Sequence, residues 1–189
     1  MINLGIIGPG LIWEITHRDV IARLGDRFRV VAVAARSQKN QERGRTAYPD
    51  ARIYASADEL IDDPTVEAVV VLTPISLNAP TALKALNAGK HAIVEKPLAR
   101  SVAEARELVA AAGRPGGPTL HILEQHVHKS LIPYLRAAID DGTIGRPVGF
   151  ERSVHARLDA ENDATGGFGT TEWRQHPDYP LGNFFDGGI

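Results

Sequence analysis

The sequence contains no cysteine, which excludes disulfide bonds and thiolate metal ligands. A chain of 189 residues, 43% of them hydrophobic, can bury a core large enough to fold without such cross-links. The absence of cysteine fits a reducing compartment, and we expect a cytoplasmic protein. The N-terminus has no basic flank followed by a long apolar stretch, so we expect no signal peptide.

Charge of one sign and long apolar runs are also scarce. The formal net charge of −2 gives no reason to expect nucleic acid or an acidic membrane as a partner. No apolar run approaches the length that spans a bilayer. His121, His126 and His128 lie close in sequence, but no carboxylate stands at a clear ligand spacing from them, so we expect no metal site.

Short apolar runs alternate with helical patterns along the first two thirds of the chain. Strands are predicted at residues 4–7, 29–34, 53–54, 68–72, 92–95 and 119–123. Helices are predicted at residues 11–24, 38–47, 56–62, 80–88 and 101–112. Two of these helices open with capping-box patterns, Ser56 with Glu59 and Ser101 with Glu104. The alternation predicts an α/β fold of the Rossmann type, a doubly wound parallel sheet with helices on both faces.

The pattern changes after residue 123, where we place the end of the first domain. A helix is predicted at residues 130–140 and a strand with one solvent-facing side at residues 148–156. Residues 159–180 are polar, glycine-rich and typical of loops. Residues 124–189 are therefore predicted to be the start of an incomplete second α/β domain.

The first predicted strand runs into Gly8-Pro9-Gly10. The first glycine permits a tight turn, and the second lets the backbone approach a pyrophosphate. The backbone amides of Leu11 and Ile12 would then bind the phosphates at the positive end of the helix dipole. The third position of the G-x-G-x-x-G pattern is Trp13 instead of a small residue. Either its side chain turns into a substrate or cofactor cleft, or the helix starts slightly displaced.

The end of the second strand bears on the choice of dinucleotide. A carboxylate about 20 residues after the glycine loop would bind the ribose 2′-hydroxyl of NAD. This segment reads Ala34-Ala35-Arg36-Ser37 and has no carboxylate. Arg36 and Ser37 would hold a 2′-phosphate instead, so the sequence favours NADP(H) over NAD(H). As a solvated residue that stacks on adenine, Arg36 would suit either cofactor.

The fifth predicted strand ends in Glu95-Lys96-Pro97. Ligands of open α/β sheets bind at the carboxyl ends of the strands, so these residues should face the cofactor crevice. Lys96 can donate to a substrate oxygen there and help move its proton. The bond before Pro97, cis or trans, would fix the direction of the lysine. A surface ion pair of Glu95 and Lys96 is the alternative interpretation.

The stretch Gly89–Pro97, which reads GKHAIVEKP, resembles the GKHV-x-x-EKP signature of the glucose–fructose oxidoreductase/inositol dehydrogenase (Gfo/Idh/MocA) family. Thr73-Pro74 resembles that family's cofactor-contacting turn, and the GTIGRP segment at residues 142–147 resembles its entry into the second domain. Trp173-Arg174 and the closing residues 182–189 resemble the approach to its catalytic D-x-x-x-H motif. The resemblance covers essentially the whole chain.

The resemblance implies an NAD(P)-dependent oxidoreductase that transfers a hydride between nicotinamide and a sugar, polyol or sugar derivative. Lys96 would be the catalytic lysine, and Asp186 would orient a partner group or bind substrate hydroxyls. Glu95 and Pro97 would line the cofactor site. Asn78 stands where many relatives carry a histidine, and it would contact the cofactor or cap its helix. Gln125 occupies a place where relatives often contact the nicotinamide.

By the same resemblance, residues 1–123 form the NAD(P)-binding domain and residues 124–189 begin the substrate and oligomerisation domain. The family often pairs subunits through that domain, so a homo-oligomer is compatible with the sequence. The family's histidine would follow Ile189, where the sequence stops. We therefore expect either a fragment or a shortened protein without its usual acid/base. The second case would be a catalytically incomplete dinucleotide-binding module that serves as a sensor or partner subunit.

Overall fold

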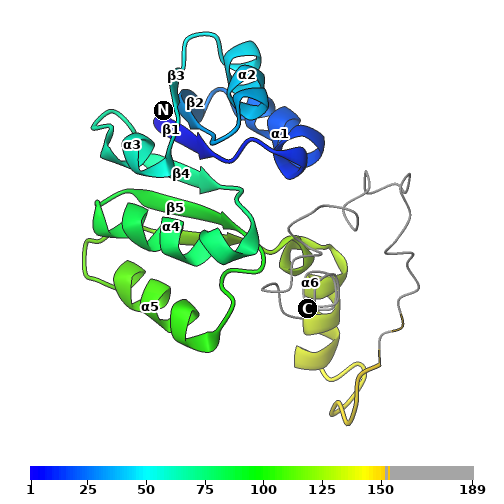
Figure 1. Ribbon diagram of the computed structural model, residues 1–189. Coiled ribbons are helices and arrows are strands. Elements are labelled where there is room, and N and C mark those ends of the chain that lie inside the picture. The colour runs from blue at the N-terminus through cyan, green and yellow to red at the C-terminus, as the bar shows by residue number, and fades with distance from the viewer. Residues whose placement is uncertain (152, 154–189) are drawn as a thin grey trace. The chain divides into compact units, whose positions relative to one another are not determined.

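The computed structural model describes residues 1–151 and 153, which fall into two compact units (Figure 1). The first unit is Met1–Leu123, and the second begins at Glu124. Six parallel strands form one sheet in the first unit, in the order β3-β2-β1-β4-β5-β6. They are β1 (Ile2–Ile7), β2 (Phe28–Ala34), β3 (Arg52–Tyr54), β4 (Ala68–Val71), β5 (His91–Glu95) and β6 (Leu120–Leu123). The strand order reverses between β1 and β4, which confirms the predicted Rossmann-type sheet.

Helices cover both faces of this sheet (Figure 1). One face packs against α3 (Ala57–Asp62), α4 (Ile75–Asn87) and α5 (Val102–Ala112). The other face packs against a π-helical turn, η1 (Trp13–His17), against α1 (Arg18–Arg23), and against the end of α2 (Gln38–Ala47). Each face has its own buried apolar cluster, so both sides of the central strands are removed from water.

Local sequence explains the starts of α3 and α5. Ser56 accepts a hydrogen bond from the Glu59 amide, and the Glu59 carboxylate accepts one from the Ser56 amide, which confirms the predicted capping box. Ser101 likewise accepts from the Glu104 amide at 3.2 Å. The Glu104 carboxylate, however, accepts from the amide of Arg100 at 3.0 Å and pairs with the Arg100 guanidinium at 2.6 Å.

The predicted start of α4 at residue 80 is wrong, because the helix begins at Ile75. Pro80 lies inside the helix and has no amide hydrogen to donate to the carbonyl four residues earlier, at Ser76. Both Pro80 and Ser76 are exposed, so water can satisfy that carbonyl. The proline is therefore tolerated on the outer side of α4, and it does not mark the first turn.

The second unit contains a short 3₁₀ turn, η2 (Gln125–His128), and the helix α6 (Leu131–Asp140), close to the predicted bounds. The strand predicted at residues 148–156 is not found at residues 148–151. Val148 and Phe150 are 97% and 84% exposed, and no strand among the described residues pairs with them. Across the described residues, no helix has the length and apolar character needed to cross a membrane.

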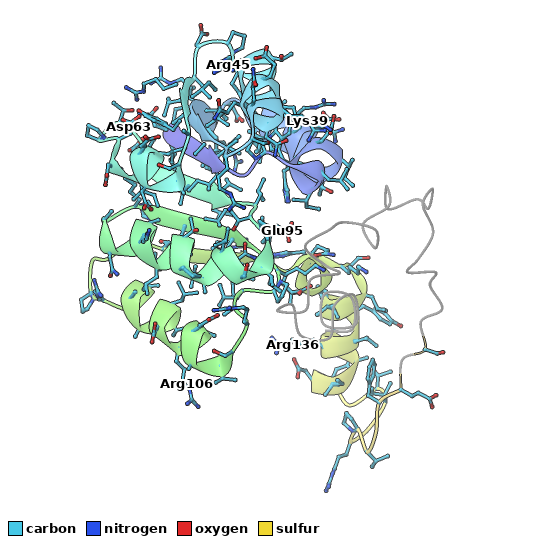
Figure 2. The ribbon with its side chains drawn as sticks, viewed as in Figure 1. Lys39, Arg45, Asp63, Glu95, Arg106 and Arg136 are labelled. Atoms are coloured by element: carbon cyan, nitrogen blue, oxygen red, sulfur yellow. The ribbon has the colours of Figure 1, made fainter. Side chains whose placement is uncertain are left out.

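A buried carboxylate anchors the end of the sheet at which β4 begins. Asp63 is 4% exposed; it accepts hydrogen bonds from the amide and hydroxyl of Thr65 and from the Tyr54 hydroxyl, and it pairs with Arg52 at 2.6 Å. Burial by itself would raise the pKa of Asp63, but these hydrogen bonds and the Arg52 charge outweigh it and hold the pKa below its ordinary value. Figure 2 shows Asp63 and Glu95 at opposite ends of the sheet.

We expect Asp63→Asn to lower the free energy of unfolding by roughly 1–3 kcal/mol at neutral pH, because the charged acceptor is lost in a buried site. The folded-state pKa is depressed, so the carboxylate stabilises the fold above its unfolded pKa of about 4 and ceases to do so as pH falls through the folded value. The difference between wild type and variant should therefore shrink at acidic pH. Urea unfolding at neutral pH and at about pH 3 measures both quantities.

Asp62→Asn is the matched control, since Asp62 is the exposed neighbour of Asp63. It should change the free energy of unfolding by less than about 0.5 kcal/mol. Equal effects of the two variants, or an Asp63→Asn effect that persists at acidic pH, would contradict the stabilising role of the charge.

Candidate active site

The turns after β1, β4 and β5 meet at one edge of the sheet, because parallel strands end on the same side. Gly8, in the turn after β1, has a φ of +82°, and its amide donates to the Ala34 carbonyl at 2.9 Å. A Cβ atom at Gly8 would lie 2.9 Å from the Leu72 carbonyl oxygen at the end of β4. Both the backbone angle and the closeness of β4 therefore require glycine at this position.

Gly10 serves a different purpose in the same turn. Its amide donates to the Gly8 carbonyl at 2.7 Å, and an added Cβ would meet no atom closer than 3.9 Å. The absence of that Cβ leaves open space in front of the backbone, which a phosphate group could occupy. A continuous helical stretch follows at residues 11–23. The amides of Leu11 and Ile12 in its first turn have no acceptor one helical turn upstream, so the residues present fit a pyrophosphate.

The helix after this turn starts irregularly, which decides between the two interpretations of Trp13. Its side chain is 2% exposed in the core beneath the sheet, with its ring 6.1 Å from that of Tyr48, and it does not enter a cleft. The backbone accommodates the large Trp13 side chain by forming the π-turn η1, in which the Arg18 amide donates to the Trp13 carbonyl. Ile15 and Val20, two of the apolar residues of the predicted helix, are 47% and 48% exposed. The wider turn shifts the buried face away from them.

The end of β2 carries cations and no carboxylate. Arg36 and Ser37 are exposed, and the Ser37 hydroxyl caps α2 by accepting from the Asn40 amide at 3.3 Å. Lys39 lies exposed in the first turn of α2 (Figure 2). These three side chains stand at the same edge as the glycine turn, since β2 is the neighbour of β1.

The turn formed by Lys96 and Pro97 (the Lys96 turn) follows β5 directly, and the Lys96–Pro97 bond is cis. Glu95 and Lys96 are both partly buried. One carboxylate oxygen of Glu95 accepts from the Lys96 amide at 2.8 Å, and the other lies 2.7 Å from His17 Nε2. The alternative interpretation of a surface ion pair does not describe Glu95, because its side chain is 14% exposed and its two oxygens bind His17 and the Lys96 amide.

Asn78 holds the other side of this turn, and its predicted role as a helix cap is wrong. It lies within α4, is 1% exposed, and donates to the carbonyls of Glu95 and Pro97, both at 3.2 Å. Its own carbonyl accepts from the Thr73 hydroxyl at 2.8 Å. Pro74 occupies the capping position of α4 without a side-chain bond. The β4 turn and the Lys96 turn are thus joined through one buried amide.

His17 was not identified from the sequence. It joins the helical stretch at residues 11–23 to the Lys96 turn. An ionised carboxylate only accepts hydrogen bonds, so His17 Nε2 is the donor to Glu95. The available signal was its position four residues after the buried Trp13 and four before the partly buried Ile21, which places a polar residue in an inward-facing stripe.

Lys90 belongs to a different part of the sheet from Lys96. Lys90, in the same signature as Lys96, is 8% exposed and donates to the carbonyls of Asp63 and Val66, both at 2.7 Å, at the opposite end of the sheet. Gln125 is exposed and belongs to the second unit. Asp186 lies outside the described residues. Within the described residues, no three carboxylate or histidine side chains gather in a way that could hold a metal ion.

A family profile described as "Oxidoreductase family, NAD-binding Rossmann fold" (GFO_IDH_MocA) matches residues 2–120. The uncharacterized protein YMR315W of Saccharomyces cerevisiae is 30% identical over 100% of this chain and 52% of its own length. The 1,5-anhydro-D-fructose reductase of Ensifer adhaerens is 41% identical over 53% of this chain and 30% of its own length. The scyllo-inositol 2-dehydrogenase (NADP(+)) IolW of Bacillus subtilis is 30% identical over 61% and 31%. The chain thus spans about half the length, or less, of these relatives.

Solved structures give the same result. An oxidoreductase from Thermotoga maritima superposes with a TM-score of 0.82 at 28% identity, over 99% of this chain and 56% of that protein. The WlbA dehydrogenase from Bordetella pertussis, crystallised with NADH and UDP-GlcNAcA, superposes with a TM-score of 0.70 at 27% identity, over 77% and 43%. With a profile match over more than half of its residues, this chain belongs to the Gfo/Idh/MocA oxidoreductase family and carries that family's NAD-binding Rossmann fold.

Proposed function

We propose that this chain binds a nicotinamide dinucleotide at the turn after β1 and that the protein transfers a hydride to or from a sugar-like or polyol substrate. The proposal rests on two features at the same edge of the sheet. The backbone at Gly10 is open, and hydrogen bonds from Asn78 and to Glu95 hold the Lys96 turn in place. The amides of Leu11 and Ile12 would bind the pyrophosphate, and the Thr73–Pro74 turn follows β4, on the other side of the switch point.

We further propose that NADP(H) is preferred over NAD(H). Arg36 and Lys39 are the only charged residues between 34 and 41, so the ribose end of the site has positive charge and lacks the carboxylate that would bind a 2′-hydroxyl. A 2′-phosphate would accept from the Arg36 guanidinium, and the exposed Ser37 hydroxyl stands beside it. The B. subtilis relative is named for NADP(+), whereas the B. pertussis structure holds NADH.

We expect Arg36→Ala to weaken NADPH binding by about 10-fold or more, because a charge-assisted hydrogen bond to the 2′-phosphate is lost. NADH binding should change by less than about 2-fold, since NADH has no 2′-phosphate. Titration of the intrinsic fluorescence of each reduced cofactor measures the two dissociation constants.

The matched control is Arg45→Ala, which removes an exposed arginine from the last turn of α2, where it pairs with Glu42 (Figure 2). It should leave both dissociation constants within about 2-fold, since surface ion pairs contribute little. A wild type that binds NADH as tightly as NADPH, or an Arg36→Ala variant that loses both equally, would refute the proposed preference.

The proposed chemistry divides the work between cofactor and protein. A bound nicotinamide supplies or accepts the hydride. The Lys96 ammonium would donate to the substrate oxygen and hold or release its proton, while the bonds from Glu95 and Asn78 fix the turn that carries it. Two relatives are named for 1,5-anhydro-D-fructose and scyllo-inositol, and the B. pertussis structure holds UDP-GlcNAcA. We therefore propose a substrate with oxygen-bearing ring carbons; Asp186 and Gln125 remain candidates for contacts with the substrate and the nicotinamide.

We expect Lys96→Met to lower turnover by about 10²–10⁴-fold, the usual contribution of a group that moves a proton. NADPH affinity should remain within about 3-fold of wild type, because the phosphate turn and the ribose end are unchanged. A panel of aldoses, inositols and nucleotide sugars, followed by NADPH absorbance, identifies the substrate and measures the loss. A variant that turns over at the wild-type rate would exclude Lys96 as the catalytic group, and a wild type inactive on the whole panel would refute the substrate class.

A further inference from the structure

The residues that would bind the dinucleotide and the residue that would act on the substrate belong to different parts of the sheet. Gly8 and Gly10 follow β1, whereas Lys96 follows β5, and β4 lies between these strands. Two strand spacings correspond to about 10 Å. The two turns are therefore too far apart for a direct backbone contact, and coupling between them passes either through β4 or through a side chain that spans the gap.

His17 crosses this gap. It lies at the end of η1, in the helical stretch whose first turn faces the proposed phosphate site, and its Nε2 lies 2.7 Å from Glu95 Oε1. The side chains of both residues are partly buried, at 13% and 14% exposure, so water competes little for this bond. The other carboxylate oxygen of Glu95 accepts from the Lys96 amide at 2.8 Å. The Glu95 carboxylate thus connects the helical stretch at residues 11–23 to the backbone of Lys96.

The π-turn sets the position of His17. A π-turn holds about one residue more than an α-turn, so it changes the direction of every side chain that follows it. In this chain Thr16 is exposed and His17 faces Glu95. A π-turn within a helix is rare and is frequent at functional sites. Here it accommodates Trp13 in the core and, at its end, presents His17 to Glu95 at the end of β5.

We propose that His17 is a positioning residue that couples dinucleotide binding to the placement of Lys96. This inference rests on the proposed function. Phosphates bound at the first helical turn would stabilise the helix and hold His17, and His17 would hold the Glu95 carboxylate against the Lys96 amide. The coupling is reciprocal, so a fixed Lys96 turn also favours the helix conformation that binds the phosphates. Asn78 holds the Lys96 turn from the side of β4. Its hydrogen bonds go to Thr73, Glu95 and Pro97, none of which lies in the helical stretch at residues 11–23.

Hydrogen exchange of the Lys96 amide, with ADP-ribose as the ligand, tests this coupling. ADP-ribose carries the pyrophosphate but no nicotinamide, so it does not place a ring over the lysine. The Lys96 amide is easy to isolate because Pro97 has none. In the wild-type full chain, ADP-ribose should slow exchange of this amide by about 5-fold or more, the lower range of allosteric coupling. The amide of Val94, in the buried part of β5, serves as the reference for global opening.

Three variants make the result specific. His17→Leu should still bind ADP-ribose, but the ligand should no longer slow exchange at Lys96. His17→Gln, whose amide nitrogen can replace Nε2 as donor to Glu95, should restore at least part of the effect. Thr16→Ala, at the exposed neighbour in the same turn, should behave as wild type.

The outcomes separate the two proposals. Binding of ADP-ribose to wild type with equal slowing in wild type and His17→Leu would mean direct shielding and would overturn the coupling. The coupling would also be overturned if ADP-ribose did not slow exchange of the Lys96 amide in wild type. It would likewise be overturned if exchange of the Val94 and Lys96 amides rose in parallel in His17→Leu. A wild type that binds neither ADP-ribose nor NADPH would instead refute the proposed dinucleotide site, and the coupling would fall with it.

Discussion

The hydrogen bonds of two polar side chains, Glu95 and Asn78, fix the turn on which the candidate site depends. Asn78 binds the carbonyls on both sides of Lys96, and Glu95 binds the Lys96 amide. Glu95 is also tied to His17 in η1, and Asn78 to Thr73 after β4. A lysine on a long side chain loses considerable conformational entropy when it is held for catalysis. A turn whose backbone is held from two directions reduces the part of this cost that must be met when a substrate binds.

At Gly8, on the other side of the switch point, the backbone is also fixed by a close contact with a neighbouring strand. The backbone at Gly8 lies so close to the Leu72 carbonyl that a Cβ atom would clash, and the positive φ at Gly8 also favours glycine. Gly10 is free of such crowding. The two glycines of one short motif therefore act differently: the first packs strands together, and the second leaves room for a ligand.

The sheet and most of its helices could be predicted because their signals are local. The buried run of β4 and the Ser56–Glu59 capping box depend on residues within one element. The roles of Asn78 and His17 at the Lys96 turn could not be predicted in this way, because Glu95 and Pro97 lie 17 or more residues away from them in sequence. The π-turn was missed for a related reason. Whether Trp13 fills a cleft or the core depends on the space beside Tyr48, which no periodicity of apolar residues records.

The segment at residues 89–97 contains two groups of residues with separate roles. Its first part lies where β5 begins, where Lys90 binds the carbonyls of Asp63 and Val66 and His91 accepts from the Thr119 amide. Its last part lies where β5 ends and carries Lys96. A strand of this length separates its two ends by about 15 Å, so the first part cannot act on a ligand at the crevice. Lys90 instead fixes the start of β5, and the strand then carries this fixed position to the turn where the chemistry is proposed to occur.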